Sequence, residues 1–262
     1  MNTNLNKIDK RVIPMHIIKF ISVILLAAAC SQIMAAEVFF DDFEGDDLKE
    51  HWEVINPDPD AFIVEEGSLL ILSNGNTDPI ATGNTPNILK LTNELPSGNW
   101  VLSTSFTADF QTEQEAVFLG LYTDNKTYVI VQPRAFHCGN WGNRLCVTVE
   151  TIKMSKGKPT TFSKRLVWEQ GFENFVFDEA AATISQPIEM RIAKEGRKYR
   201  AGIQWKVTNA KTKVTTEKWI DLPKFTILRQ KGKPAVGIYQ VNRNQGETVV
   251  NFDWVKLEAA AE

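Results

Sequence analysis

A short run of polar and aromatic residues carries the first candidate chemistry in this sequence. In YVIVQPR, the alternation of a strand places Tyr128, Ile130, Gln132 and Arg134 on one face, and His137 follows. On a concave sheet, such side chains can neutralise a uronate carboxyl group and abstract the neighbouring proton, as a polysaccharide lyase does. The alternative is a solvated outer strand that leads into a hairpin loop. We therefore treat four residues as catalytic candidates but do not assign catalysis to them: Tyr128, Gln132, Arg134 and His137.

Recognition of sugars is the second candidate chemistry. Trp141 lies between glycines in HCGNWGNRLC, which argues against a position in the core. Aromatic rings stack on the C–H faces of sugars, and planar polar groups bind their hydroxyls. The predicted ligand-binding residues are Trp141, Phe136, Asn140 and Arg144, although packing within the loop explains the same pattern equally well.

Two cysteines bracket this loop. Cys138 and Cys146 lie eight positions apart between two strand-like runs. In an oxidising compartment they would close the hairpin as a disulfide worth about 2 to 3 kcal/mol, whereas two unpaired thiols are the alternative. We predict the Cys138 to Cys146 disulfide.

The elements that must position these residues are β-strands. From residue 37 onward, β-branched and aromatic runs alternate with Gly, Pro, Asn and Asp clusters, and nothing marks a linker or a repeat. Hairpin turns are expected at Glu66-Gly67, Asp124-Asn125 and Glu195-Gly196, and residues 171–186 could hold a short helical turn. The predicted strands are 38–43, 52–55, 61–65, 68–73, 88–92, 100–110, 116–124, 127–134, 145–153, 161–168, 188–194, 199–207, 215–220, 235–241 and 248–257.

This pattern predicts an all-β protein with two packed antiparallel sheets in one domain, residues 37–262. Five tryptophans sit in alternating apolar strands and are expected in the core, whereas Trp168 is undecided. They are Trp52, Trp100, Trp205, Trp219 and Trp254.

The first 36 residues have the composition of a signal peptide. An apolar stretch over residues 17–29 is too short for a comfortable transmembrane helix, and it lies between basic residues and Ala35-Ala36. The protein is thus predicted to be exported to the periplasm or beyond, with translation starting at Met1 or Met15. Acylation at Cys30, which would anchor a lipoprotein, is the less favoured alternative. No transmembrane segment is expected after removal of the signal.

Charge limits the class of partner. Without residues 1–36 the chain keeps 25 basic and 31 acidic residues, a net charge of −6. Such an acidic surface argues against nucleic acid as a partner.

Three segments carry a resemblance to a known superfamily: FFDDFEGDDLKEHWEVINPD, FLGLYTDNKTYVIVQ and VGIYQVNRNQGETVVNFDWVKLE. Together they resemble the concanavalin A-like lectins and glucanases, and above all the β-sandwich modules of some family 43 β-xylosidases. The resemblance implies a jelly-roll sandwich. It also implies a structural Ca²⁺ ion held by Asp42, the Gly45 carbonyl and Asp253, with Asp41, Glu44 and Asp47 in reserve; the alternative is that these acids are solvated strand ends.

The glucanases of this superfold carry a Glu-x-Asp-x-(x)-Glu strand, which places nucleophile and acid about 5 to 5.5 Å apart. No strand here has that spacing. Glu113 and Glu115 come nearest, but they lie in QTEQEA, which we interpret as a loop.

The sequence therefore predicts an exported carbohydrate-binding or glycan-associated sandwich protein with a structural calcium ion, whose partner is an oligo- or polysaccharide. An extracellular polysaccharide-degrading enzyme, either a lyase or a glycoside hydrolase, is the alternative. A structural or adhesive envelope protein is the third possibility.

Overall fold

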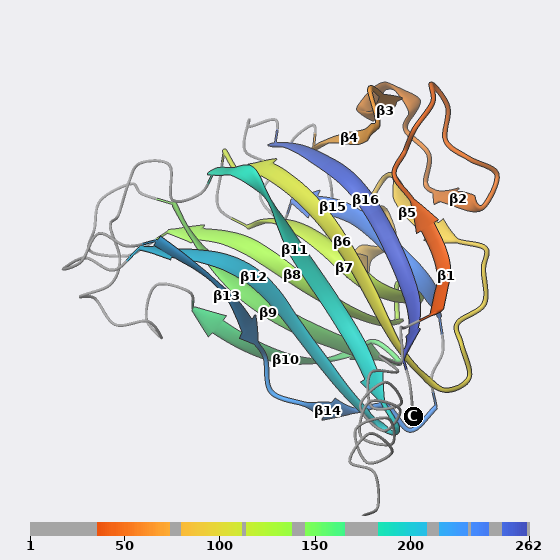
Figure 1. The fold of residues 1–262 in the computed structure, drawn as a ribbon, viewed down its shortest axis with the longest axis vertical. Coiled ribbons are helices and arrows are strands. Elements are labelled where there is room, and N and C mark those ends of the chain that lie inside the picture. Colours follow the sequence, from red (N-terminus) through yellow and green to blue (C-terminus); the bar gives the residue numbers. More distant parts are fainter. Residues whose placement is uncertain are drawn as a thin grey trace, which may run out of the picture. The chain divides into compact units, whose positions relative to one another are not determined.

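The computed structural model describes residues 36–73, 80–111, 114–137, 145–165, 183–208, 215–229, 232–240 and 248–260 (Figure 1). All of them belong to the compact unit Ala35–Glu262. The signal segment lies outside the described residues except for Ala36, so export and cleavage remain predictions. Within the described part of the chain, no helix combines the length and apolar character needed to cross a membrane.

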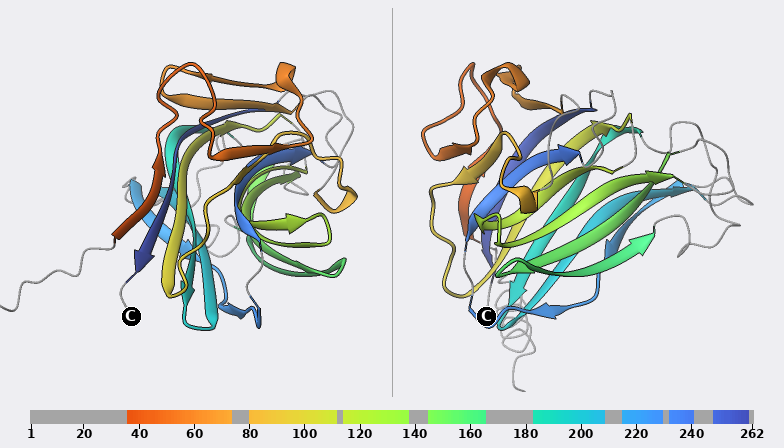
Figure 2. Two further views of the ribbon diagram at one scale, coloured as in Figure 1. Left: turned by 90° about the vertical axis from the view of Figure 1, so that its right-hand side faces the viewer. Right: turned by 180° about the vertical axis from the view of Figure 1, so that it is seen from behind.

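The described chain forms two antiparallel sheets that face each other as two layers (Figure 2). Sheet A has nine strands in the order β13-β12-β11-β6-β16-β4-β3, with β1 beside β16 and β14 beside β12. They are β1 (Ala36–Asp41), β3 (Phe62–Glu65), β4 (Ser68–Ser73), β6 (Asn99–Asp109), β11 (Thr183–Glu195), β12 (Lys198–Thr208), β13 (Thr215–Asp221), β14 (Phe225–Thr226) and β16 (Thr248–Ala260). The predicted two-sheet sandwich is confirmed.

Sheet B has seven strands in the order β10-β9-β8-β7-β15-β5-β2. They are β2 (Trp52–Ile55), β5 (Ile88–Leu91), β7 (Glu115–Asp124), β8 (Thr127–His137), β9 (Leu145–Ser155), β10 (Lys158–Arg165) and β15 (Lys233–Gln240). The sheet is curved, and its concave side faces away from sheet A (Figure 2). We call this side the outer face of sheet B.

Each predicted strand overlaps an observed one, but some local predictions are wrong. The sequence analysis missed β14, and Ala61 belongs to the short 3-10 helix η1 (Pro59–Ala61) instead of a strand. Residues 183–186 lie in β11 and not in a helical turn, while 171–182 lie outside the described residues. Glu115, interpreted as a loop residue, begins β7 and is buried.

The turn prediction at Glu66-Gly67 is confirmed, and two others are displaced by one residue. Asp124 pairs with Thr127 and Glu195 pairs with Lys198, so the two-residue turns are Asn125-Lys126 and Gly196-Arg197. Strand pairing continues one residue further than composition indicates, because a polar residue at a strand end can pair as well as an apolar one.

The main core lies between the sheets and contains Trp52 and Trp100, as predicted, with Trp205 packed against its edge. The prediction is wrong for Trp219 and Trp254, which are half-buried on the outer face of sheet A. Trp219 lies opposite Gln204 and stacks under the Arg191 guanidinium, 3.7 Å from the ring centroid.

A β-bulge explains the position of Trp254. Strict alternation from the buried Phe252 would place Trp254 in the core, but the register shifts between these two residues and inserts Asp253. The next core positions are therefore Val255 and Leu257. The apolar phase of VNFDWVKL changes at the same point, which is the sequence signal for this bulge.

Sheet B is apolar on both faces. Val117, Leu119 and Leu121 of β7 face the main core, whereas Phe118 and Tyr122 face outward into a second buried cluster. That cluster also takes in Ile80, Ile88, Ala116, Tyr128, Ile130, Met154, Ala235 and Tyr239. Ile80 begins the 3-10 helix η2 (Ile80–Thr82), so the segment between β4 and β5 helps to cover the outer face of sheet B.

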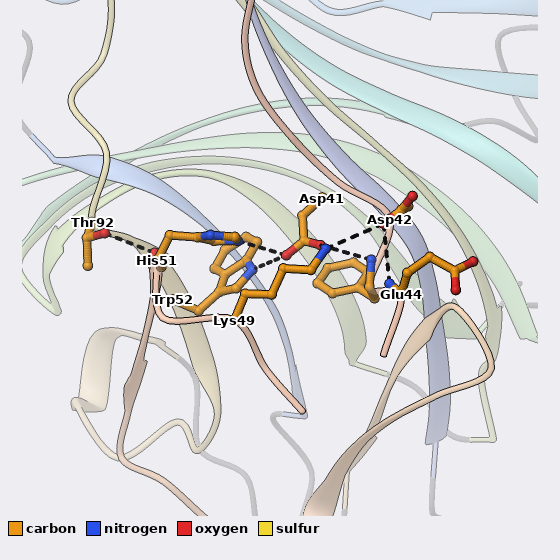
Figure 3. A network of polar contacts seen from close by, with 8 residues as sticks. Asp41, Asp42, Glu44, Lys49, His51, Trp52 and Thr92 are labelled. Atoms are coloured by element: carbon orange, nitrogen blue, oxygen red, sulfur yellow. Dashed lines mark hydrogen bonds and ion pairs between the residues drawn. The ribbon is translucent and has the colours of Figure 1, made fainter. Parts of the chain in front are cut away.

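Asp41 is a buried carboxylate at the end of β1 that joins the two sheets (Figure 3). Its Oδ1 accepts hydrogen bonds from Lys49 Nζ at 2.5 Å and from the Phe43 backbone N–H at 3.0 Å. Its Oδ2 accepts from Trp52 Nε1 at 2.8 Å and lies 2.9 Å from His51 Nε2. Because Trp52 lies in β2 of sheet B, one carboxylate fixes the start of sheet A against the edge of sheet B.

The surroundings of Asp41 favour its charged form. Burial by itself raises the pKa of a carboxyl group, but the hydrogen bonds from Lys49, Trp52, His51 and the Phe43 N–H outweigh burial and hold the pKa of Asp41 below its ordinary value. A carboxylate whose pKa is lower in the folded state contributes stability above its unfolded pKa, and this stability is lost as the pH falls through the folded value.

We expect Asp41→Asn to lower the free energy of unfolding at neutral pH by about 3 kcal/mol, because the amide keeps only one of the two buried oxygens that accept hydrogen bonds from Lys49, the Phe43 N–H and Trp52. The difference from the wild type should begin to shrink below about pH 4, where the unfolded chain protonates this carboxyl group, and it should be lost as the pH falls through the lower pKa of folded Asp41. Urea unfolding across this pH range, in the presence of a chelator, measures both effects. Asp42→Asn is the control, since Asp42 is half-exposed and 3.5 Å from Lys49 Nζ, and it should change stability by less than about 1 kcal/mol. Equal losses for the two variants would contradict a special role for Asp41.

Gly120 marks a close approach of β7 to β8. A Cβ atom at this position would lie 2.0 Å from the Val129 carbonyl oxygen and 2.7 Å from the Ile130 Cα. Gly120→Ala should therefore destabilise the protein by at least about 3 kcal/mol in urea unfolding. Gly157→Ala in the β9–β10 turn meets no atom within 4 Å and should lose only about 1 kcal/mol, from its positive φ. A loss no larger at Gly120 than at Gly157 would show that the sheet adapts there.

Candidate functional site

Polar side chains gather on the outer face of sheet B, where strand β8 crosses it. The predicted alternation is confirmed: Tyr128 and Ile130 belong to the outer cluster, whereas Val129 and Val131 belong to the main core. Gln132 and Arg134 continue the outer row. They lie where the apolar surface gives way to polar residues.

Five residues from four neighbouring segments form one hydrogen-bonded chain, which we call the Arg134 cluster: Tyr239, Gln132, Glu150, Arg134 and Gln114. The Tyr239 hydroxyl donates to Gln132 Oε1 at 2.8 Å, and Gln132 Nε2 donates to Glu150 Oε2 at 3.1 Å. Arg134 donates from Nε to Glu150 Oε2 at 3.0 Å and from Nη2 to Oε1 at 2.8 Å. Arg134 Nη1 also donates to Gln114 Oε1. The two-point contact fixes the plane of the guanidinium.

Strand register explains why these residues meet. Gln132 lies opposite Glu150 on β9, and Arg134 lies opposite Ala116 on β7 and Thr148 on β9. Tyr239 lies opposite Ala116 on the far side of β7. Strands β9, β8 and β15 therefore present polar groups at one level of the sheet, and the small side chain of Ala116 on β7 lies between β8 and β15.

The cluster has a buried layer and an accessible layer. Gln132, Glu150 and Tyr239 are buried. The Arg134 side chain retains 22% of its exposure, and Gln114 and Phe136 are half-buried. Phe136 follows Arg134 by two residues, so a predicted ligand-binding residue and a predicted catalytic candidate share one surface. The buried layer holds the guanidinium in place, and the accessible layer can touch a ligand.

The cluster lies at the end of sheet B from which long connections leave. Arg134 pairs with Ala116 and Thr148, and Thr148 pairs with Arg165. The connections 138–144 and 166–182 follow directly from these strand ends. We call this the loop end of sheet B.

Two described acids, Glu115 and Glu53, were candidates to act with Glu150 as a hydrolytic carboxylate pair. Glu115 on β7 shares the inward face of Val117 and accepts a hydrogen bond from the Gln111 N–H. Glu53 on β2 shares the outer face but lies five strands away, roughly 24 Å at the usual strand spacing. The carboxyl groups of glycosidases lie about 5 to 9.5 Å apart. Neither described acid can therefore complete such a pair with Glu150.

The four lyase candidates do not all converge. Tyr128 lies six residues from Arg134 along β8, roughly 20 Å, among apolar side chains. Burial raises the pKa of Tyr128 to about 12, so it stays protonated at neutral pH. Tyr239 stands beside Gln132 instead, and burial raises the pKa of its hydroxyl even further above the ordinary value. Gln132 and Arg134 do come together, while the side chain of His137 lies outside the described residues.

The predicted recognition loop lies mostly outside the described residues. This applies to Asn140, Trp141, Arg144 and Cys138, and only the backbone of Cys146 is described. The expected hairpin is confirmed, since Phe136 pairs with Cys146 and His137 with Leu145. Along the chain, residues 138–144 connect β8 to β9. The disulfide stays a prediction.

The described residues do not form a calcium cage around the predicted ligands. Asp42 Oδ1 accepts from the Glu44 N–H at 3.3 Å and lies 3.5 Å from the Lys49 ammonium, and Asp253 Oδ2 accepts from the Ser105 hydroxyl at 2.7 Å. Among the residues that the structure describes, no three His, Cys, Asp or Glu side chains are grouped to hold a metal. Calcium prefers six to eight oxygen ligands, and a nearby ammonium group opposes it. The ion stays an expectation from the resemblance, and the function proposed below is not built on it.

Sequence reasoning missed how Glu150, Tyr239 and Gln114 enter the cluster. Thr148 and Glu150 share one face of a predicted strand, but the pairing of Glu150 with Gln132 depends on β8 continuing to His137, three residues past its predicted end. The position of Tyr239 had no local signal, because it depends on β15 lying next to β7.

Comparison with solved structures shows the concanavalin A-like fold of this chain. A family 43 glycoside hydrolase protein from Bacillus licheniformis matches with a TM-score of 0.60 at 13% identity, over 84% of this chain and 39% of that one. A xylan β-1,4-xylosidase from Bacillus halodurans matches with 0.53 at 12% identity, over 84% and 38%. A β-1,3-glucanase from Mycobacterium marinum matches with 0.50 at 12% identity, over 84% and 98%.

These similarities concern the fold. The chain spans about two fifths of the length of the first two proteins. No protein-family model and no curated protein matches it. The architecture is that of the β-sandwich parts of such glycoside hydrolases, as the sequence resemblance implies.

Proposed function

We propose that this protein is a glycan-binding β-sandwich whose binding surface is the loop end of the outer face of sheet B. The observation that carries the proposal is the Arg134 cluster. It is a fixed, planar, hydrogen-bonding group set beside the apolar cluster of the concave face.

The chemistry of the cluster suits sugar hydroxyls. Arg134 is held by Glu150 at two points, so its guanidinium is planar, oriented and already neutralised. Gln114 adds an amide that can donate and accept, and Phe136 adds an aromatic ring two residues from Arg134. A rigid polar plane beside a ring is the combination that sugar binding uses, and it loses little conformational entropy on binding.

The loop that follows Phe136 extends the same surface in this proposal. Asn140, Trp141 and Arg144 lie in the connection between β8 and β9, whose flanking strands form the loop end. We assign Trp141 to stacking on a sugar ring and the other two to its hydroxyls. Export, inferred from the signal segment, would bring the protein to extracellular polysaccharide.

Binding without turnover is the form of this function that the described residues support. Glu150 is engaged by Arg134 and has no described carboxylate at hydrolytic distance, and neither tyrosine near β8 is poised to act as a base at neutral pH. The glycoside hydrolase neighbours support a glycan-related role through shared architecture alone.

The proposal is tested by a glycan and polysaccharide array with purified residues 37–262, followed for retention and for released reducing or unsaturated ends. We expect retention of at least one neutral glycan and no product. Retention should survive chelation, because Arg134, Gln114 and Phe136 are not among the predicted calcium ligands. Release of product would show that the protein is an enzyme. Failure to retain the protein on any glycan of the array would overturn the proposal.

Substitutions locate the surface. Trp141→Ala and Gln114→Ala should each weaken retention at least about tenfold, the effect of losing roughly 1.4 kcal/mol of contact. Trp219→Ala is the matched control, since Trp219 is half-buried on the other sheet, and it should leave retention unchanged. Circular dichroism and thermal unfolding verify that the variants are folded. If only the Trp219 variant lost retention, the binding site would lie on sheet A.

A further inference from the structure

A second polar site lies at the opposite end of sheet B. An open pocket of about 480 Å³ is lined there by Lys90, Glu94, Leu95, Tyr122 and Lys233, among others. It lies at the ends of β5, β7 and β15 that face away from the Arg134 cluster. Tyr122 pairs with Tyr128, six residues before Arg134, so roughly 20 Å separate this two-lysine pocket from the cluster.

Sheet register places the two lysines side by side. Lys90 lies opposite Ala235, and Lys233 precedes Ala235 by two residues on the same outward face. Such diagonal neighbours are about 7 Å apart, so one small anion can reach both ammonium groups. Gly232 permits this geometry: its φ is +92°, and a Cβ there would lie 2.9 Å from the Tyr122 carbonyl carbon.

The ammonium groups are held in place but retain donors. Lys90 Nζ lies 2.7 Å from Glu53 Oε2, and Lys233 Nζ donates to the Thr92 carbonyl at 2.6 Å and lies 3.1 Å from Glu94 Oε1. Each ammonium has three N–H donors. Among the described residues these contacts use one donor of Lys90 and two of Lys233.

The acidic partners are easily displaced. The Glu94 side chain is 86% exposed and that of Glu53 is 50% exposed, whereas the Lys90 side chain is only 17% exposed. Exposed ion pairs contribute little free energy, typically below about 1 kcal/mol. An incoming carboxylate can therefore replace Glu94 at small cost, while the cations stay fixed by the sheet and by the Thr92 carbonyl.

Part of the pocket lining is apolar. Leu95 and Tyr122 contribute to it, beside Thr123 and Gly232. An inorganic anion would use the lysines alone and leave this apolar lining unused. A sugar ring that bears a carboxylate would use both, because its C–H face packs on the apolar residues while its carboxylate bridges the lysines.

We propose that the two-lysine pocket binds a uronic acid residue of an acidic glycan. This site is separate from the neutral, hydrogen-bonding surface around Arg134 and does not depend on it. The pocket lies at the end of sheet B that carries the Asn125-Lys126 turn, which we call the turn end.

Titration calorimetry with a galacturonate trisaccharide, a galactose trisaccharide and sodium sulfate tests the proposal. We expect the galacturonate trisaccharide to bind at least about tenfold more tightly than the other two, and to weaken as salt is raised. Equal affinity for the neutral trisaccharide, or for sulfate, would overturn the assignment to a uronic acid, as would the absence of galacturonate binding.

Variants connect the binding to the pocket. Lys90→Met and Lys233→Met should each weaken galacturonate binding at least about tenfold. Lys156→Met, an equal charge change in the exposed β9–β10 turn, should not weaken it. Trp141→Ala, which tests the site at the loop end, should leave galacturonate binding in the pocket intact, so the two proposals can fail independently. Unchanged binding in both pocket variants would place the site elsewhere.

Discussion

Burial of both faces of sheet B is the constraint on which the rest of this structure depends. One face packs against sheet A. The other carries Phe118, Tyr122, Tyr128 and Ile130, and without a cover these side chains would expose a large apolar patch to water. Short segments outside the sheet, including η2 with Ile80, must therefore fold back over it. The Arg134 cluster and the two-lysine pocket lie toward the two ends of the outer face, on either side of this buried cluster.

The two ends differ in how their charges are compensated. At the loop end, Arg134 is bound to the buried Glu150 at two points, a pairing that adds little net stability but specifies the orientation of the side chain. At the turn end, the lysines rely on exposed partners that compete weakly with a ligand. The first arrangement suits directional hydrogen bonds to hydroxyls, and the second suits exchange of one carboxylate for another.

The fold is shared with glycoside hydrolases, but shared architecture does not carry chemistry with it. Glycosidases hydrolyse with two carboxylates at a defined distance, whereas Glu150 on this concave face is hydrogen-bonded to an arginine. At the start of the chain, the buried Asp41 is bound by Lys49 and Trp52 and ties the two sheets together.

Approximate strand positions, the turns to within one residue and the inward or outward face of residues 128–134 were determined by the sequence alone, because alternation and turn chemistry act over a few residues. The phase change in VNFDWVKL was also visible locally, although its effect on Trp254 required the pairing of β16 with β6. Only the tertiary structure decided which strands are neighbours. The hydrogen bond between Tyr239 and Gln132 joins residues 107 positions apart in the chain. Lys90 and Lys233 are neighbours only because β15 lies beside β5. Such contacts follow from the order of strands in the completed sheet, which no local pattern encodes.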